Sequence, residues 1–69
     1  MYRFYNMIDG TLTDIVSNIS KEEMYRYAAF IYNMLQNICV KCNIEYALDS
    51  VIITANINKH KYVYIGEEC

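Results

Sequence analysis

The sequence predicts a small α+β domain in which one long amphipathic helix packs on an antiparallel sheet. Three observations carry this prediction: a helix-start signal at Ser20, β-branched segments near both ends of the chain, and an Asp9-Gly10 turn signal. A chain of 69 residues forms one domain, residues 1–69. The favoured element order is ββαββ.

The helix is expected to begin directly after Ser20. Ser20 and Glu23 form a capping box, in which each side chain accepts a hydrogen bond from the backbone N–H of the other residue. Ile19 and Met24 occupy the positions of a hydrophobic staple around this cap. Apolar residues then recur at spacings of three and four, which places one stripe on the helix for packing. The stripe consists of Met24, Ala28, Ile31, Leu35, Ile38 and Cys42.

The stripe extends to Cys42, so the helix is predicted to end around Cys42-Asn43. Lys41 would complement the negative end of the helix dipole. Asn43 can adopt the left-handed conformation that closes many helices. The prediction therefore assigns residues 41–43 to the last turn of the helix.

The C-terminal part is predicted to be a β-hairpin. Residues 51–57 are rich in β-branched side chains, which favour strands. Residues 58–61 read as the turn, and Tyr62–Ile65 as the second strand, closed by Gly66.

The N-terminal part allows two interpretations. Asp9-Gly10 between two apolar segments is typical of a hairpin, because glycine tolerates the positive φ that a type I′ turn requires. The alternative is a short helix capped near Thr11–Asp14 and running to Asn18, followed by the long helix and the C-terminal hairpin. The β-branched residues between 11 and 16 favour the hairpin.

Charge and apolar content limit the compartments and the classes of partner that we expect for the protein. Six Lys and Arg stand against eight Asp and Glu, so the basic excess typical of nucleic-acid binders is missing. No apolar run approaches the roughly 20 residues of a membrane span, and no signal peptide is evident. Three cysteines without an export signal indicate reduced thiols. We therefore expect a cytoplasmic protein, in the host cytoplasm if the gene is viral or from a phage.

Cys39-Val40-Lys41-Cys42 resembles a metal or redox motif by spacing alone. Cys39, Cys42, His60 and Cys69 could together supply four zinc ligands, giving a zinc-stabilised mini-domain. However, the pair falls near the predicted C-terminus of the helix, where the dipole does not lower a thiol pKa. Free cysteines often behave as small apolar residues, so we expect structural thiols and no cofactor.

A basic and aromatic cluster lies at the predicted C-terminal hairpin. Lysines beside tyrosines can bind a nucleotide or single-stranded nucleic acid by phosphate contact and stacking. This alternative function would use Lys59, His60, Lys61, Tyr62 and Tyr64. The small number of basic residues and the neighbouring Glu67 and Glu68 make a solvated hairpin tip the better interpretation.

The exposed side of the predicted helix carries residues that suit a protein interface. Phe30 lies outside the core stripe among polar neighbours, and aromatic side chains with arginine are enriched in binding hot spots. Tyr25 and Tyr32 flank the stripe on its other side. The predicted partner-binding residues are Arg26, Phe30, Asn33, Asn37, Tyr25 and Tyr32.

The sequence contains no recognisable combination of catalytic residues, so no enzymatic activity is expected. With 55% hydrophobic residues, the chain has more apolar surface than one small core can hide. We expect a protein that binds another protein as an inhibitor, adaptor or regulatory subunit, including an inhibitor of host defence encoded by a phage or virus. A homodimer is expected as well, because two-fold dimers are the commonest soluble oligomers.

Overall fold

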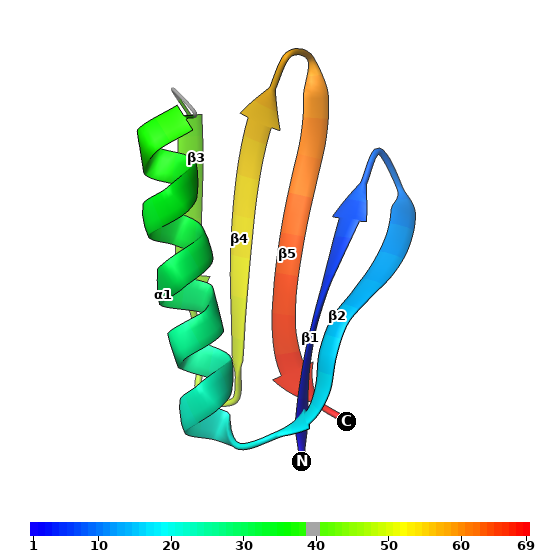
Figure 1. Cartoon of the computed structure of the whole chain (residues 1–69), viewed down its shortest axis with the longest axis vertical. Helices are drawn as coiled ribbons and strands as arrows, with labels where there is room; N and C mark the ends of the chain where they lie inside the picture. Colours follow the sequence, from blue (N-terminus) through cyan, green and yellow to red (C-terminus); the bar gives the residue numbers. More distant parts are fainter. Residues whose placement is uncertain (39–40) are drawn as a thin grey trace.

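The computed structural model describes residues 1–38 and 41–69. The five strands form one antiparallel sheet in the order β2-β1-β5-β4-β3, and the helix packs on one of its faces (Figure 1). The elements along the chain are β1 (Tyr2–Ile8), β2 (Thr11–Ile19), α1 (Lys21–Ile38), β3 (Lys41–Tyr46), β4 (Ser50–Ile57) and β5 (His60–Glu68). No helix in the described part of the chain is long and apolar enough to cross a membrane.

The ββαββ prediction is wrong, because a fifth strand follows the helix. The helix α1 ends at Ile38, and residues 41–43 begin β3 instead of capping a helix. Cys42 does continue the helical spacing of the apolar stripe. Yet residues 41–46 also alternate polar and apolar side chains, as a half-buried strand does. Pairing of β3 with β4 satisfies backbone groups of both strands, and this tertiary contact decides between the two patterns.

The N-terminal segment forms the predicted hairpin, so the alternative with an additional short helix is also wrong. Strands β1 and β2 pair from Ile8 and Thr11 outwards. Asp9 has φ 50° and Gly10 has φ 89°, the pair of positive angles that a type I′ turn requires.

The C-terminal hairpin is confirmed, but its turn is shorter and its strands are longer than predicted. Only Asn58 and Lys59 lie between β4 and β5, with φ 51° and 69°. Both values are again those of a type I′ turn, for which asparagine at the first position is well suited. His60 and Lys61 therefore belong to β5.

The helix start and its packing follow the sequence closely. Glu23 N–H donates to Ser20 Oγ at 3.1 Å, and Ser20 N–H donates to Glu23 Oε1 at 3.2 Å, which confirms the capping box. The core joins the helix stripe to the facing side of the sheet. Its fully enclosed members include Met24, Ala28 and Leu35 from α1 with Phe4, Val51, Ile53 and Ala55 from the strands.

The helix covers only part of this sheet face. Its first turns lie close to β1 and β5, where Met24 contacts Gly66 and Phe4. Its last turns lie over β3, at the edge of the sheet (Figure 1). The parts of β1, β2 and β5 near the two hairpin turns have no helix above them, and this uncovered area is important for the candidate site.

Candidate functional site

One side of α1 carries large apolar side chains that its own sheet does not cover. Tyr27, Phe30, Met34 and Ile38 are spaced by three, four and four residues and so share one side of the helix. Their exposed fractions are 38%, 67%, 47% and 67%. We call these four residues the apolar flank.

The apolar flank points toward the uncovered part of the sheet. The ring of Tyr27 stacks on Phe4 of β1, with 6.3 Å between ring centroids. Ile38 was predicted to be part of the core stripe, but it is exposed, and the end of α1 lies over β3 at the edge of the sheet (Figure 1). Burial along α1 thus ends at Leu35, although the predicted stripe extends to Cys42.

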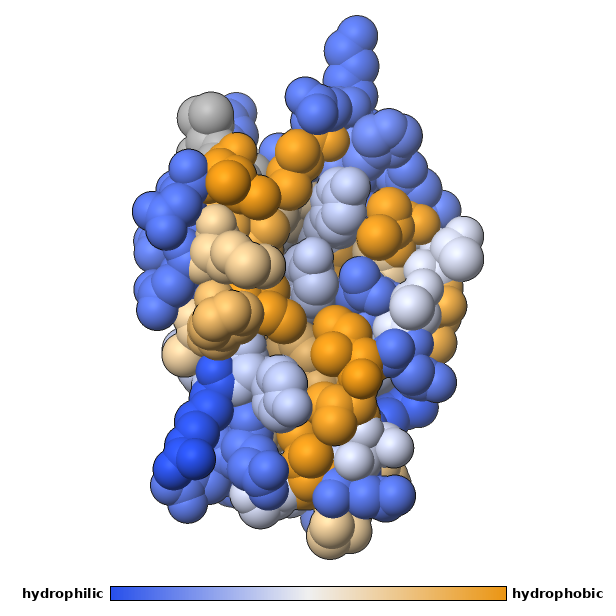
Figure 2. Space-filling model, viewed as in Figure 1, coloured by the Kyte–Doolittle hydropathy of each residue, from blue (hydrophilic) through white to orange (hydrophobic). Residues whose placement is uncertain are grey.

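The strands beside the flank present further apolar surface. Ile8 pairs with Tyr62, and Phe4 with Val16, so the register places these side chains on the helix-facing side of the sheet. We call the half-buried residues Ile8, Val16, Tyr62 and Tyr64 the sheet floor. Figure 2 shows apolar residues along this side of the helix and over the adjoining strands.

The predicted interface residues around Phe30 lie exposed on α1. Asn33 and Asn37 are exposed, and Arg26 forms an ion pair of 3.2 Å with Glu22 one turn earlier. A surface pocket of about 330 Å³ is lined by Arg26, Tyr27 and Phe30. An aromatic ring and a guanidinium thus line one shallow depression at the end of the apolar flank.

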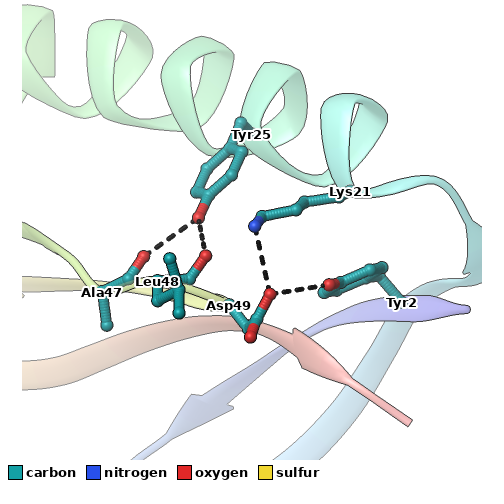
Figure 3. Close-up of polar contacts among 6 residues, drawn as sticks. All are labelled: Tyr2, Lys21, Tyr25, Ala47, Leu48 and Asp49. Carbon is teal, nitrogen blue, oxygen red and sulfur yellow. Dashed lines mark hydrogen bonds and ion pairs between the residues drawn. The ribbon is translucent and has the colours of Figure 1, made fainter.

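Tyr25 and Tyr32 lie on the opposite side of the helix, so the predicted interface residues do not form one surface. The Tyr25 hydroxyl donates to the carbonyl oxygens of Ala47 at 3.0 Å and Leu48 at 3.1 Å (Figure 3). The Tyr25 ring also contacts Tyr46, with centroids 5.8 Å apart. Tyr32 is half-buried against the core. Tyr25 therefore anchors the β3–β4 turn.

The same turn is held by a second set of polar contacts. Asp49 accepts from Lys21 Nζ at 3.1 Å and from the Tyr2 hydroxyl at 2.9 Å (Figure 3). The Lys21 contact lowers the pKa of Asp49, and the hydrogen bond to Asp49 raises the pKa of Tyr2. The turn projects Leu48 into solvent, 82% exposed. This turn was not predicted from the sequence, because residues 41–43 were assigned to the last turn of the helix and no strand was expected at residues 41–46.

The basic and aromatic cluster is brought together at the end of the sheet, but an acid lies within it. Asp9 contacts the His60 Nδ1 at 2.5 Å and accepts from the Lys61 backbone N–H at 3.0 Å. The hydrogen bond with His60 lowers the pKa of Asp9. Tyr62 and Tyr64 are half-buried in the sheet floor, and burial raises the pKa of Tyr64. Asp9 therefore offsets the positive charge that phosphate binding would need. Lys59 is exposed in the β4–β5 turn.

The three candidate metal ligands in the described part of the chain are not brought together. Cys42 lies half-buried in β3, while His60 begins β5 and Cys69 follows the other end of that strand. Cys39 lies outside the described residues. Among residues 1–38 and 41–69, no group of three or more His, Cys, Asp or Glu could hold a metal ion.

Comparison with known proteins adds no relative to this description. No protein-family model matches the chain, and no curated protein or solved structure matches it either.

Proposed function

We propose that this protein acts in the cytoplasm, without catalysis of its own, by binding another protein as an inhibitor, adaptor or regulatory subunit. The observation that carries the proposal is the apolar flank, where four large side chains lie exposed beside an uncovered part of the sheet. Contiguous exposed apolar surface with polar residues around it marks interaction sites on proteins. The polar residues here are Arg26, Asn33 and Asn37.

The dimensions of this surface favour a partner that contributes an amphipathic helix. The axes of β2 and β5, on either side of β1, lie about 10 Å apart at a strand spacing of about 4.8 Å. With the width of the strands themselves included, the three strands occupy about 14 Å of the sheet. An α-helix with its side chains is about 10–12 Å wide. A partner helix could therefore lie on the sheet floor beside α1, at the usual helix–helix distance of about 8–10 Å. Its apolar stripe would contact the apolar flank on one side and the sheet floor below.

Phe30 is the proposed anchor of this contact. It is among the most exposed large apolar side chains of α1, and it borders the pocket shared with Arg26. Aromatic residues and arginine dominate the binding energy of many interfaces because they combine large apolar area with few lost rotamers or with directed hydrogen bonds. Arg26, Asn33 and Asn37 would form the polar rim.

Affinity capture with matched variants tests the proposal. The bait is the full chain, immobilised and exposed to lysate from the source organism or its host. Phe30→Glu places a charge in the contact and should abolish co-purification of the partner. Gln36→Glu introduces the same charge on the solvent-facing side of α1 and should leave capture unchanged. A photo-crosslinking residue at position 30, but not at position 36, should link to the same protein.

Two outcomes would contradict the proposal. One is capture of the same proteins by wild type and Phe30→Glu, with equal crosslinking from positions 30 and 36. The other is salt-sensitive capture of nucleic acid alone, which would favour the cluster around Lys59 and Lys61. Circular dichroism of each variant must first show the wild-type spectrum, so that lost capture reports on the contact and not on folding.

A further inference from the structure

The sheet face opposite α1 is apolar at its centre, although no element of the described chain covers it. Side chains alternate between the two faces, so the register identifies this second set. Tyr5 pairs with Ile65, Ile65 with Ile52, and Met7 with Val63. We call the residues Tyr5, Met7, Leu12, Ile52, Val63 and Ile65 the bare face.

The pattern along the middle of β5 is that of a strand buried on both sides. An antiparallel sheet with one solvated face normally places polar residues at every second position. In β5, however, Val63 and Ile65 occupy outward positions between the inward Tyr62, Tyr64 and Gly66. In β4, Ile52 lies outward between two core residues and is 40% exposed. The middle of β5 thus has the composition of a covered surface, and Ile52 extends it onto β4, whose other outward positions are polar.

One end of the bare face is held in a fixed arrangement. Arg3 Nη2 lies 2.9 Å from Glu67 Oε2, and its guanidinium lies 4.5 Å from the centroid of the Tyr5 ring. The Tyr5 hydroxyl donates to Glu67 Oε1 at 3.2 Å. These contacts leave the Tyr5 side chain only 7% exposed in the single chain. An ordered surface loses little side-chain entropy when it is covered.

We propose that a second copy of this chain covers the bare face, so that two sheets pack against each other in a homodimer. The bare face is centred on β5, the middle strand of the sheet. We place the two-fold axis between the two sheets, parallel to both and crossing β5 at the level of Tyr64. It then brings the apolar centre of one bare face onto the apolar centre of the other, as an isologous contact requires. In this arrangement Val63 approaches Ile65 of the second copy. Lys61 at one end of β5 then faces the end that carries Glu67.

The outline of the molecule is compatible with a dimer interface of standard size. Its two longer extents are 34 Å and 22 Å, so two sheet faces stacked over their whole outline, polar rim included, would cover about 750 Å². A standard interface buries about 800 Å² of each partner. Two packed sheets lie about 10 Å apart with interdigitated side chains, and the large residues of the bare face fill such a space. The contact leaves α1 and the apolar flank free on the outside of both copies, so it goes beyond the proposed function and does not depend on it.

Sedimentation equilibrium across a concentration series tests this inference. Wild type should form a dimer, and Ile52→Lys should weaken dimerisation by about 100-fold, about tenfold for the charge in each copy. Phe30→Lys, which adds the same charge to the opposite face, should leave the dimer intact. Circular dichroism verifies that each variant is folded.

A second readout does not require a disruptive substitution. The chain contains no tryptophan, so Ile52→Trp introduces a single fluorescent reporter on the bare face. Its emission should shift to shorter wavelength as the chain concentration rises, while that of Ile38→Trp on the apolar flank should not. A monomer at all concentrations up to about 1 mM would overturn the inference. So would a dimer that Phe30→Lys abolishes and Ile52→Lys does not.

Discussion

Met24 of α1 lies so close to Gly66 of β5 that a side chain at position 66 would displace its neighbours. A Cβ added there would lie 2.6 Å from Met24 Cγ and 2.9 Å from a ring carbon of Phe4. Gly66 therefore permits the close approach of the helix to the sheet, and this approach sets the start of the diagonal path of α1. The requirement is for space and not for a left-handed backbone.

Gly66→Ala should lower the free energy of unfolding by about 1–3 kcal/mol, because overpacking forces neighbouring side chains from their preferred positions. Chemical denaturation measures this cost. The same substitution in a Met24→Ala background should cost less, because the side chain that causes the closest conflict is then absent. Equal costs in the two backgrounds would mean that Met24 does not limit the space at Gly66.

Ser20→Ala should lower the free energy of unfolding by about 1 kcal/mol. The substitution removes the hydroxyl that accepts from Glu23 N–H and leaves a helix N–H without its partner. Ser17→Ala, at an exposed position of β2, is the matched control and should change stability by less than about 0.5 kcal/mol. An unchanged denaturation midpoint for Ser20→Ala would show that water replaces this cap without cost.

Tyr25→Phe should lower the free energy of unfolding by about 0.5–1.5 kcal/mol. The ring and its packing are retained, while the two carbonyls of the β3–β4 turn lose their hydroxyl donor. Amide hydrogen exchange of residues 47–49 should become faster in this variant. Tyr32→Phe, about two turns further along the same side of α1, is the control. Unchanged exchange in Tyr25→Phe would contradict the anchoring role of this hydroxyl.

The contact between Asp9 and His60 should contribute a pH-dependent part of the stability. The pKa of Asp9 is lowered in the folded protein, so its carboxylate stabilises the fold above the unfolded pKa of about 3.9. That contribution is lost as the pH falls through the lower folded-state pKa. Asparagine also suits the first position of a type I′ turn, so Asp9→Asn is a conservative comparison. The stability difference between wild type and Asp9→Asn should decrease from about pH 5 to about pH 2. A difference that stays constant over this range would show that Asp9 has no lowered pKa.

The residues of the proposed interface were only partly predictable. Phe30 was predicted because it lies outside the core stripe, whereas Tyr27 and Met34 were not among the predicted interface residues. Helical periodicity gives the relative directions of side chains, but it does not give the width of the sheet beneath them or the angle of the helix across it. A signal was nevertheless present, because Tyr27, Phe30 and Met34 form one group beside Ile38 on a helical wheel. That group is too broad for the single stripe that one sheet can cover.

The sequence alone determined the start of α1 and the position of the N-terminal turn. Both depend on contacts between residues a few positions apart: Ser20 with Glu23, and the positive φ angles of Asp9-Gly10. The tertiary structure decided the end of the helix and the identity of residues 41–46. Cys42 suits both a helical stripe and an alternating strand, so local pattern does not separate the two. Strand β4 supplies hydrogen-bond partners for residues 41–46, and this pairing across the β3–β4 turn lies outside the segment whose own pattern is ambiguous.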